Sequence, residues 1–480
     1  MTGGGRLQAL ILAVLVALAL LGPARNVDAA ELWFEDLKSS ATPEQLYRFL
    51  YAMPKGADLH NHLPGADRSE WLWDAALAQR DRGYVYYTRV RVGNCHEYGR
   101  NEFGPAKTLL FKTIQDSSYR TLQSCEQTEF KALADLTEPE KLAWMDSQRL
   151  NETWEGRDEF FNAHFDRVND LLLNPYVISE ILLSNMEAFG KEGLVYLELM
   201  QFVNGAIRAD GSPFPPDEVA DIYRKVIASP RARATGVEVR FISTVLRFAP
   251  DAEDILRREY ATVDRYRDLF VGVNLVGRED NDKGYPLRFL PVLRELRHRY
   301  SGINLSIHAG EVDEPDAHIR DTLLLGAQRI GHGVNLITDP EGMRLMRNGP
   351  YLVEINLISN LLLEYVSDYS QHPFGEYLRT GIPVALSTDD RGMWDSNMTD
   401  EFFVAVREFN LSWEEIVQLG RNSLKYSFLD EPTKQRLLAT YEQRIAAFAQ
   451  AFRRKGWNAL AGSQAVTYTF TCRRYKVCLQ

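Results

Sequence analysis

Eight short runs rich in β-branched and aromatic residues alternate along this chain with segments long enough to form helices. Such alternation predicts parallel strands joined by crossover helices, and a count of eight favours a closed (β/α)8 TIM barrel of the α/β class. An open doubly wound sheet is the alternative. The predicted strands are residues 57–60, 194–202, 237–246, 269–276, 303–308, 329–333, 351–356 and 384–388.

One connection between predicted strands is much longer than the others, because residues 63–193 separate the first strand from the second. Within it, a stretch rich in Tyr, Arg and Gly predicts an inserted subdomain over the barrel mouth, and a long ordered loop is the alternative. A chain of 480 residues can hold such a decorated barrel as a single unit. The expected parts are a signal peptide (1–29), an N-terminal helical arm (30–55), the barrel (56–455) with its insertion at about 83–160, and a C-terminal tail (456–480).

The N-terminus predicts export. A short start with one Arg precedes an almost unbroken apolar run over residues 7–21, and small residues follow up to Val27-Asp28-Ala29-Ala30. This order is typical of a secretory signal that is cleaved after Ala29 or Ala30. An uncleaved membrane anchor is the alternative, although the run is short for a membrane span. We therefore expect a secreted protein, periplasmic or extracellular, without stable membrane association once the signal is removed.

The cysteines and the charge agree with that placement. Four cysteines are present, and in an exported protein they predict two disulfides, Cys95–Cys125 and Cys472–Cys478, although four cysteines allow three pairings. Four free thiols are the alternative if the chain is not exported. The net charge is −11 and no basic block occurs, so we expect no nucleic-acid partner.

Polar motifs end several of the predicted strands, and the carboxyl ends of barrel strands converge on one mouth. His60 and His62 alternate on one strand, so both side chains point into the barrel. His308 and Asp389 end two other strands and complete a set of three imidazoles and one carboxylate that leaves a position for water. The fourth strand ends at Val276-Gly277 without the Lys that binuclear barrel sites add, so we expect one metal ion per chain. Zinc fits these ligands best, with iron or manganese as alternatives.

Three further polar residues neighbour these ligands. Glu311 follows His308 by three residues and is the candidate proton carrier, with capping of a helix as its alternative role. His332 ends the sixth predicted strand and is a candidate to hold the metal-bound water and take its proton, with a satisfied core histidine as the alternative. Asp390 is adjacent to Asp389, so its side chain points elsewhere and is available to the substrate. Together with the metal ligands, these residues favour a hydrolase.

These motifs resemble those of the adenosine/AMP deaminase family of metal-dependent barrel hydrolases. The likeness runs in order from about residue 37 to about residue 452. The exported start, the lead-in Met53-Pro54-Lys55-Gly56 and the cysteine-bearing insertion are most similar to the secreted, growth-factor-related adenosine deaminases. The segments that carry the resemblance are residues 53–63, 306–311, 329–333 and 387–390, with residues 354–360 as a weaker match.

The resemblance implies a role for each matched residue. Glu311 would donate a proton to purine N1, and His332 would orient the attacking water. Asp390 would hydrogen-bond N7, and the backbone N–H of Gly277 would bind N3. The implied reaction is the zinc-dependent hydrolytic deamination of adenosine, and of 2′-deoxyadenosine, to inosine and ammonia. The implied zinc ligands are His60, His62, His308 and Asp389.

One position departs from the family pattern. Classical members have an Asp two residues after the second His, where it contacts the ribose, but this chain has Pro64. Asp67 or the insertion would then supply that contact. Two other functions stay open: deamination of another purine (adenine, AMP or a modified nucleoside), and a secreted signalling or binding protein with a vestigial barrel. The expected partner is a small purine nucleoside, and the N-terminal arm either forms a homodimer, as the resemblance implies, or packs on the barrel.

Overall fold

The computed structural model describes residues 29–93, 95, 109–281, 283–312, 314 and 316–479. Residues 1–28 of the predicted signal peptide, and a part of the predicted insertion, lie outside the described residues. Among the helices that are described, none combines the length and the hydrophobicity that crossing a bilayer requires.

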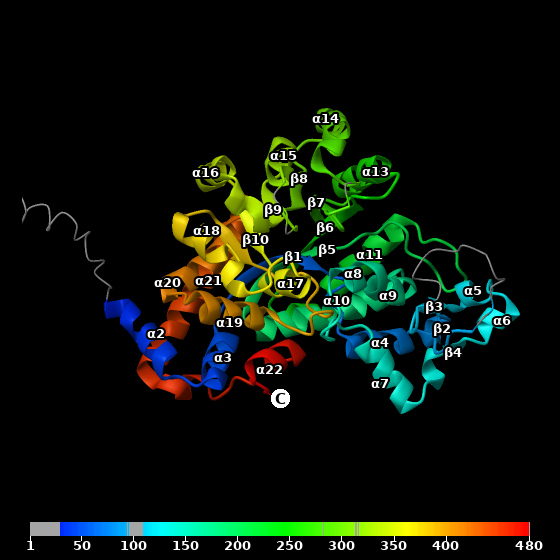
Figure 1. The fold of residues 1–480 in the computed structure, drawn as a ribbon, viewed down its shortest axis with the longest axis horizontal. Coiled ribbons are helices and arrows are strands. Elements are labelled where there is room, and N and C mark those ends of the chain that lie inside the picture. The colour runs from blue at the N-terminus through cyan, green and yellow to red at the C-terminus, as the bar shows by residue number, and fades with distance from the viewer. Residues whose placement is uncertain are drawn as a thin grey trace, which may run out of the picture.

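Eight parallel strands form a barrel, which confirms the predicted (β/α)8 fold (Figure 1). Each strand pairs with the next one along the chain, as crossover connections through helices require. The strands are β1 (Gly56–His62), β5 (Leu194–Met200), β6 (Glu238–Leu246), β7 (Phe270–Val276), β8 (Asn304–Ala309), β9 (Arg329–His332), β10 (Leu352–Ile355) and β11 (Val384–Leu386).

The barrel closes where the turn after the last strand meets the first strand. Asn61 and Asp389 form a parallel bridge. The backbone N–H of His62 donates to the carbonyl oxygen of Asp389 at 3.1 Å, and the N–H of Asp389 donates to His60 at 2.9 Å. The alternative of an open sheet is therefore wrong. The same hydrogen bonds set three of the predicted metal ligands side by side in the backbone.

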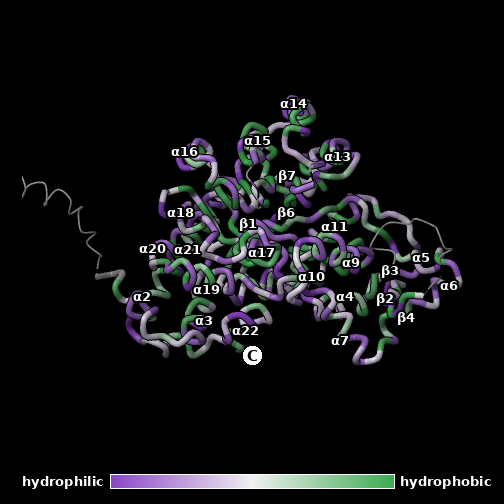
Figure 2. Tube along the Cα trace, in the orientation of Figure 1, coloured by the Kyte–Doolittle hydropathy of each residue, from purple (hydrophilic) through white to green (hydrophobic). Residues whose placement is uncertain are grey.

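Helices surround the barrel and bury their apolar faces against it, so that hydrophobic and hydrophilic residues alternate along them (Figure 2). Three long helices follow the last strand and precede the C-terminal tail. The main outer helices are α10 (Pro175–Lys191), α11 (Pro216–Ile227), α13 (Ala252–Arg265), α14 (Leu290–Arg299), α15 (His318–Leu324), α16 (Pro340–Asn348), α18 (Phe374–Thr380), α19 (Met398–Phe409), α20 (Trp413–Lys425) and α21 (Glu431–Lys455).

The long connection between β1 and β5 contains a small antiparallel sheet beside the barrel (Figure 1). A disulfide joins Cys95 to Cys125 in this region. The chain then returns to the barrel mouth through a π-helical turn at Phe160–His164 and α9 (Phe165–Leu172). The other elements of this connection are α4 (Ser69–Ala78), β2 (Tyr86–Arg89), β3 (Thr113–Gln115), β4 (Phe130–Ala132), α7 (Glu138–Asp146) and several shorter turns.

The N-terminal arm consists of α2 (Ala29–Ser40) and α3 (Pro43–Ala52). Thr42 and Gln45 form a reciprocal capping box at the start of α3. Aromatic rings attach the arm to its own barrel: Trp33 lies 5.0 Å from Trp413 on α20, and Phe49 lies 4.8 Å from Phe452 on α21, measured between ring centroids. The arm therefore packs on the barrel within one chain.

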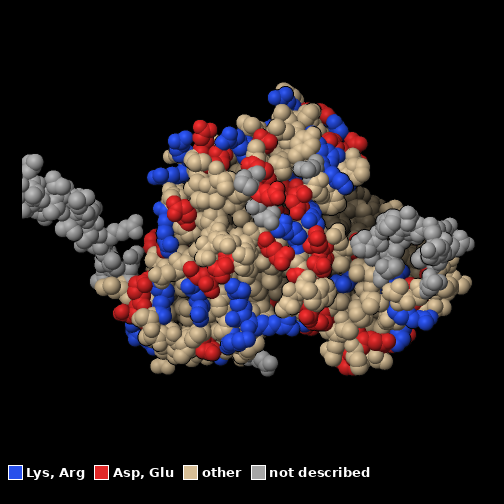
Figure 3. Space-filling view, in the orientation of Figure 1, with Lys and Arg blue, Asp and Glu red and all other residues tan. Residues whose placement is uncertain are grey.

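The C-terminal tail returns to the same side of the molecule. It contains α22 (Thr469–Tyr475), and a disulfide joins Cys472 to Cys478 just beyond this helix. Of the three pairings that four cysteines allow, the structure has the two disulfides expected from the sequence. The face drawn in Figure 3 mixes acidic and basic side chains, in keeping with a sequence that has no basic block.

Candidate active site

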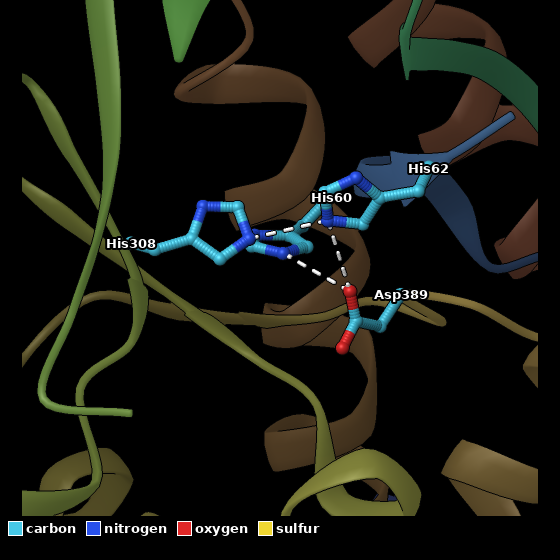
Figure 4. Close-up of side chains that lie close together, drawn as sticks. All are labelled: His60, His62, His308 and Asp389. Carbon is cyan, nitrogen blue, oxygen red and sulfur yellow. Dashed lines mark hydrogen bonds and ion pairs between the residues drawn. The ribbon is translucent and has the colours of Figure 1, made fainter. Parts of the chain in front are cut away.

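The four predicted metal ligands lie together at the mouth of the barrel (Figure 4). His60 and His62 come from β1, His308 from β8, and Asp389 from the turn after β11. Nε2 of His62 is 3.2 Å from Nε2 of His308. Oδ1 of Asp389 is 3.3 Å from Nε2 of both His60 and His62. Three imidazole nitrogens and one carboxylate oxygen that converge in this way could hold a divalent metal ion such as zinc.

Backbone features at the strand ends make this convergence possible. Asp389 has a φ of 54°, a left-handed conformation that few non-glycine residues adopt and that clusters at functional sites. Gly331 on β9 leaves room for the His60 ring, because a Cβ at this position would lie 2.7 Å from Cε1 of His60. The cluster therefore depends on a glycine of β9, a strand that carries none of the four predicted ligands, as well as on the ligands themselves.

A second layer of polar side chains holds the imidazoles, and sequence reasoning missed its role. Glu354 on β10 accepts from Nδ1 of His60 at 2.7 Å, and Asn274 on β7 accepts from Nδ1 of His308 at 2.9 Å. Arg329 contacts Glu354 at 2.6 Å in the fully buried centre of the barrel. Because the Nδ1 atoms are engaged, the Nε2 atoms face the site. The sequence signal that could have identified Asn274 and Glu354 is a polar residue at a strand position that faces the barrel core.

Glu311 lies just beyond β8 and reaches the same site. Oε1 of Glu311 is 3.7 Å from Nε2 of His332. Burial, together with the charges of Asp389 and Glu279, raises the pKa of the Glu311 carboxyl well above its usual range. A carboxyl whose pKa is raised in this way is suited to act as a general acid.

His332 ends β9 and is completely buried. The side-chain amide nitrogens of Asn356 and Asn360 lie 3.3 and 3.0 Å from its Nδ1. Its Nε2 has no hydrogen-bond partner within the described part of the chain and lies near Glu311 and Asp389. Burial lowers the pKa of His332 to about 3, which keeps the ring neutral.

Asp390 faces the cavity next to the metal cluster. Its Oδ1 is buried without a hydrogen-bond partner among the described residues. Burial and the charge of Asp389 raise its pKa well above the usual range for Asp. Its carboxyl can therefore donate a hydrogen bond. Gly65, on the loop after β1, makes room for it, because a Cβ at Gly65 would lie 1.6 Å from Oδ1 of Asp390.

A cavity of about 690 Å³ is lined at one end by His62, His308, Glu311, Asp389 and Asp390, whereas His60 and His332 lie behind this lining. This volume lies within the range of pockets for small organic ligands. Gly277, which follows β7 with a φ of 93°, lines the cavity near its catalytic end. Apolar residues dominate the remaining wall, which comprises Phe160, Phe161, Phe165, Leu172, Leu173, Met200, Phe202, Leu246, Phe248, Ile255 and Val276, with Asp166, Asn169, Asn204, Thr244, Arg258 and Glu259 as the polar members.

The position of the missing family Asp is occupied by Pro64, which lines this cavity. Asp67 is buried and is not among the lining residues, and burial raises its pKa to about 8. Asp166 and Asn169 on α9 do line the cavity. Polar contacts to the outer part of a substrate are thus available from the segment that follows the insertion rather than from Asp67.

Known proteins of similar sequence support the interpretation of this site as that of a hydrolase. The family model described as "Adenosine deaminase" matches residues 137–443. An adenosine deaminase of Phlebotomus duboscqi is 24% identical over 415 residues, covering 84% of this chain and 78% of the relative. Adenosine deaminase 2 of Sus scrofa is 24% identical over 466 residues, covering 92% of this chain and 88% of the relative.

Solved structures share the barrel. An adenine deaminase from Arthrobacter aurescens superposes with a TM-score of 0.60 at 18% identity, covering 82% of this chain and 99% of that structure. An N6-mAMP deaminase of Arabidopsis superposes with a TM-score of 0.58 at 22% identity, covering 82% of this chain and 99% of that structure. An amidohydrolase of Burkholderia ambifaria with bound zinc superposes with a TM-score of 0.57 at 17% identity, covering 90% of this chain and 97% of that structure. By its family match and its relatives, the chain belongs to the adenosine deaminase family and is a hydrolase that deaminates a purine.

Proposed function

We propose that this protein catalyses the zinc-dependent hydrolytic deamination of adenosine, and of 2′-deoxyadenosine, to inosine and ammonia. The observation that carries the proposal is the convergence, beside one cavity, of a metal donor set with two buried carboxyls whose pKa values are raised. The relatives that carry the name adenosine deaminase support the choice of substrate.

The residues at the site fit one metal ion. Nε2 of His60 is buried and has no hydrogen-bond partner within the described residues, which is what a nitrogen reserved for a metal would show. Burial and the neighbouring imidazoles lower the pKa of His308 well below its usual range, so that ring is neutral, as a ligand must be. The proposed ligands of the single zinc ion are His60, His62, His308 and Asp389. When bound, zinc lowers the pKa of a coordinated water towards about 7.

The protein side chains then supply proton transfer and orientation. Glu311 donates its proton to purine N1, which makes C6 a better electrophile, and His332 orients the water that adds to C6. The protonated Asp390 donates to N7, which can only accept a hydrogen bond, and Gly277 offers its N–H to N3. The oxygen of water becomes bonded to C6, the bond between C6 and the amino nitrogen breaks, and ammonia leaves. One proton of the water replaces the proton that Glu311 gave to N1, and the other joins the amino nitrogen, so adenosine and water give inosine and ammonia.

Of the two alternatives, only the deamination of another purine has a specific observation in its favour. Solved barrels of similar fold include an adenine deaminase and an N6-mAMP deaminase, so another purine is the second candidate substrate. A nucleotide is disfavoured, because Arg258 is the only Lys or Arg among the described residues that line the cavity, and its Nε already donates to Glu259 at 3.1 Å. A signalling or binding protein with a vestigial barrel would not need an intact set of proton-transfer groups.

The test is ammonia release by the purified protein, loaded with zinc, from adenosine, 2′-deoxyadenosine, adenine and AMP. We expect turnover of the two nucleosides, one zinc per chain by elemental analysis, and loss of activity on chelation that added zinc restores. His308→Ala should lose both zinc and activity. Two stoichiometric metals, full activity after complete metal removal, or selective turnover of adenine or AMP would contradict the proposal.

We also propose that the chain is exported and loses residues 1–29. The disulfides Cys95–Cys125 and Cys472–Cys478 support an oxidising compartment. N-terminal sequencing of the mature protein checks the cleavage.

A homodimer stays a prediction from the resemblance, and the mass of the native protein in solution checks it.

A further inference from the structure

A second cluster of titratable side chains lies directly behind Glu311. Ligand-type atoms of Glu279, Asp316 and His318 are within 4.8 Å of one another. Glu279 follows β7 and its side chain is fully buried, whereas Asp316 and His318 are partly exposed at the start of α15. The oxygens of Glu279 already accept from three N–H groups, so this cluster is an internal contact between loops rather than a place for an ion.

The buried carboxylate of Glu279 binds two successive peptide N–H groups of the loop that carries Glu311. Gly310 donates to Oε1 at 3.2 Å, and the N–H of Glu311 donates to Oε2 at 2.9 Å. Gly310 has a φ of 76°, so the loop turns sharply and presents both N–H groups on one side. Successive N–H groups arranged in this way form an anion-binding concavity. The backbone of Glu311 is therefore fixed from the rear while its side chain faces the cavity.

Two further side chains, His318 and Arg247, lie against the carboxylate of Glu279. Nδ1 of His318 donates to Oε1 at 2.7 Å, because a carboxylate can only accept. Nη1 of Arg247 is 4.0 Å from Oε2 of Glu279 and donates to the carbonyl oxygen of His308 at 2.7 Å. One set of contacts thus supports both the strand end that bears a proposed zinc ligand and the turn that bears the proposed acid.

We propose that Glu279 and His318 are positioning residues for proton transfer: they fix the peptide of Glu311 so that its carboxyl is aimed at purine N1. The inference rests on the proposed function, since it assigns a task to groups that support its acid. A displacement of about 1 Å in a reacting group can lower a rate by about 10²-fold. Glu279 does not line the cavity, and its hydrogen-bond partners among the described residues include none of the proposed zinc ligands, so its substitution should act on the chemical step.

The first test is Glu279→Gln. The amide keeps the size of the side chain, but its nitrogen faces a peptide N–H, so one of the two donors loses its acceptor. We expect kcat to fall by about 10- to 100-fold, with KM little changed and zinc content at one per chain. Loss of zinc, or an increase in KM with an unchanged kcat, would overturn the positioning role.

A pair of variants at the partly exposed His318 tests the same role without a substitution at the buried Glu279. His318→Asn keeps a nitrogen donor at about the place of Nδ1, whereas His318→Leu removes it. His318→Asn should retain most of kcat, and His318→Leu should lose several-fold. His298→Leu is the matched control, because His298 is an exposed residue on α14. Equal losses for the Asn and Leu variants would contradict the role of the donor.

The decisive measurement is a double-mutant cycle with Glu311→Gln, which should keep zinc and lose about 10²–10⁴-fold in kcat. If Glu279 acts through Glu311, adding Glu279→Gln to Glu311→Gln produces almost no further loss, because no acid is left to aim. Losses that multiply would overturn the inference. A wild-type protein that released no ammonia from any purine would instead contradict the proposed function, so the two failures are distinguishable.

Discussion

At the scale of single residues, the site depends on small side chains as much as on catalytic ones. Gly331 makes room for the ring of His60, a proposed metal ligand, and Gly65 makes room for Asp390. Sequence reasoning found the polar members of the site because they end strand-like runs. It did not find these glycines, since their role is set by what lies opposite them in three dimensions.

Gly65→Ala should therefore disturb substrate binding without touching the metal. The new Cβ would lie 1.6 Å from Oδ1 and 2.5 Å from Cγ of Asp390, so the carboxyl must leave its place. Loss of one buried hydrogen bond costs about 1–3 kcal/mol, so we expect kcat/KM for adenosine to fall by about 5- to 150-fold with zinc content unchanged. Gly462→Ala is the control, because nothing lies within 4 Å of its Cβ position. An unchanged kcat/KM would mean that Asp390 does not contact the substrate.

At the scale of elements, all eight strands were predicted close to their observed positions, because buried parallel strands form short apolar runs that the sequence displays directly. The second-layer partners Asn274 and Glu354 were not assigned roles. Their contacts with His308 and His60 depend on barrel register and closure, which local sequence does not encode. The role of Glu279 was missed for the same reason, because its hydrogen-bond partners Gly310, Glu311 and His318 follow the next strand, β8.

At the start of α19, Asp400 joins the N-terminal arm and the C-terminal tail to the barrel, and its contribution to the stability of the fold should depend on pH. Asp400 accepts from Tyr47 of the arm at 2.8 Å and from Thr471 of the tail at 2.7 Å. Burial raises its pKa from 3.8 to about 7. The folded state therefore binds more protons than the unfolded state between about pH 4 and 7, and the stability from this group is lost as the pH rises through that window.

Asp400→Asn cannot titrate, so its stability relative to the wild type should rise between pH 4 and 8, by up to about 4 kcal/mol. Urea unfolding at several pH values measures the difference. Asp74→Asn, on an exposed position of α4, should run parallel to the wild type. A constant difference between Asp400→Asn and the wild type across this range would mean that Asp400 is ionised throughout.

At the scale of the whole molecule, segments far apart in the chain build the cavity. The catalytic end comes from the strand ends, and the outer wall comes from α9, which follows the insertion, and from α13 with the loops after β5 and β6. The sequence predicted the first part through its motifs. It could not predict the second, because apolar side chains on a helix look the same whether they face a core or a cavity. This outer wall decides which substituent the far end of a purine substrate can carry.

In the proposed orientation C6 faces the metal ligands, so the ribose on N9 extends towards this apolar outer wall. An adenosine whose 5′-hydroxyl is replaced by a methylthio group should then have a kcat/KM within about tenfold of adenosine. For AMP, kcat/KM should be lower by about 100-fold or more, because its phosphate would meet Asp166 and Glu259, and Arg258 is the one cationic side chain among the described residues of the lining. Like charges brought together cost several kcal/mol. Ile255→Lys adds a cation to this wall and should narrow the gap between AMP and adenosine. Competition kinetics with the three substrates measure both effects, and AMP turnover that equals that of adenosine would show that the ribose leaves the cavity by another side.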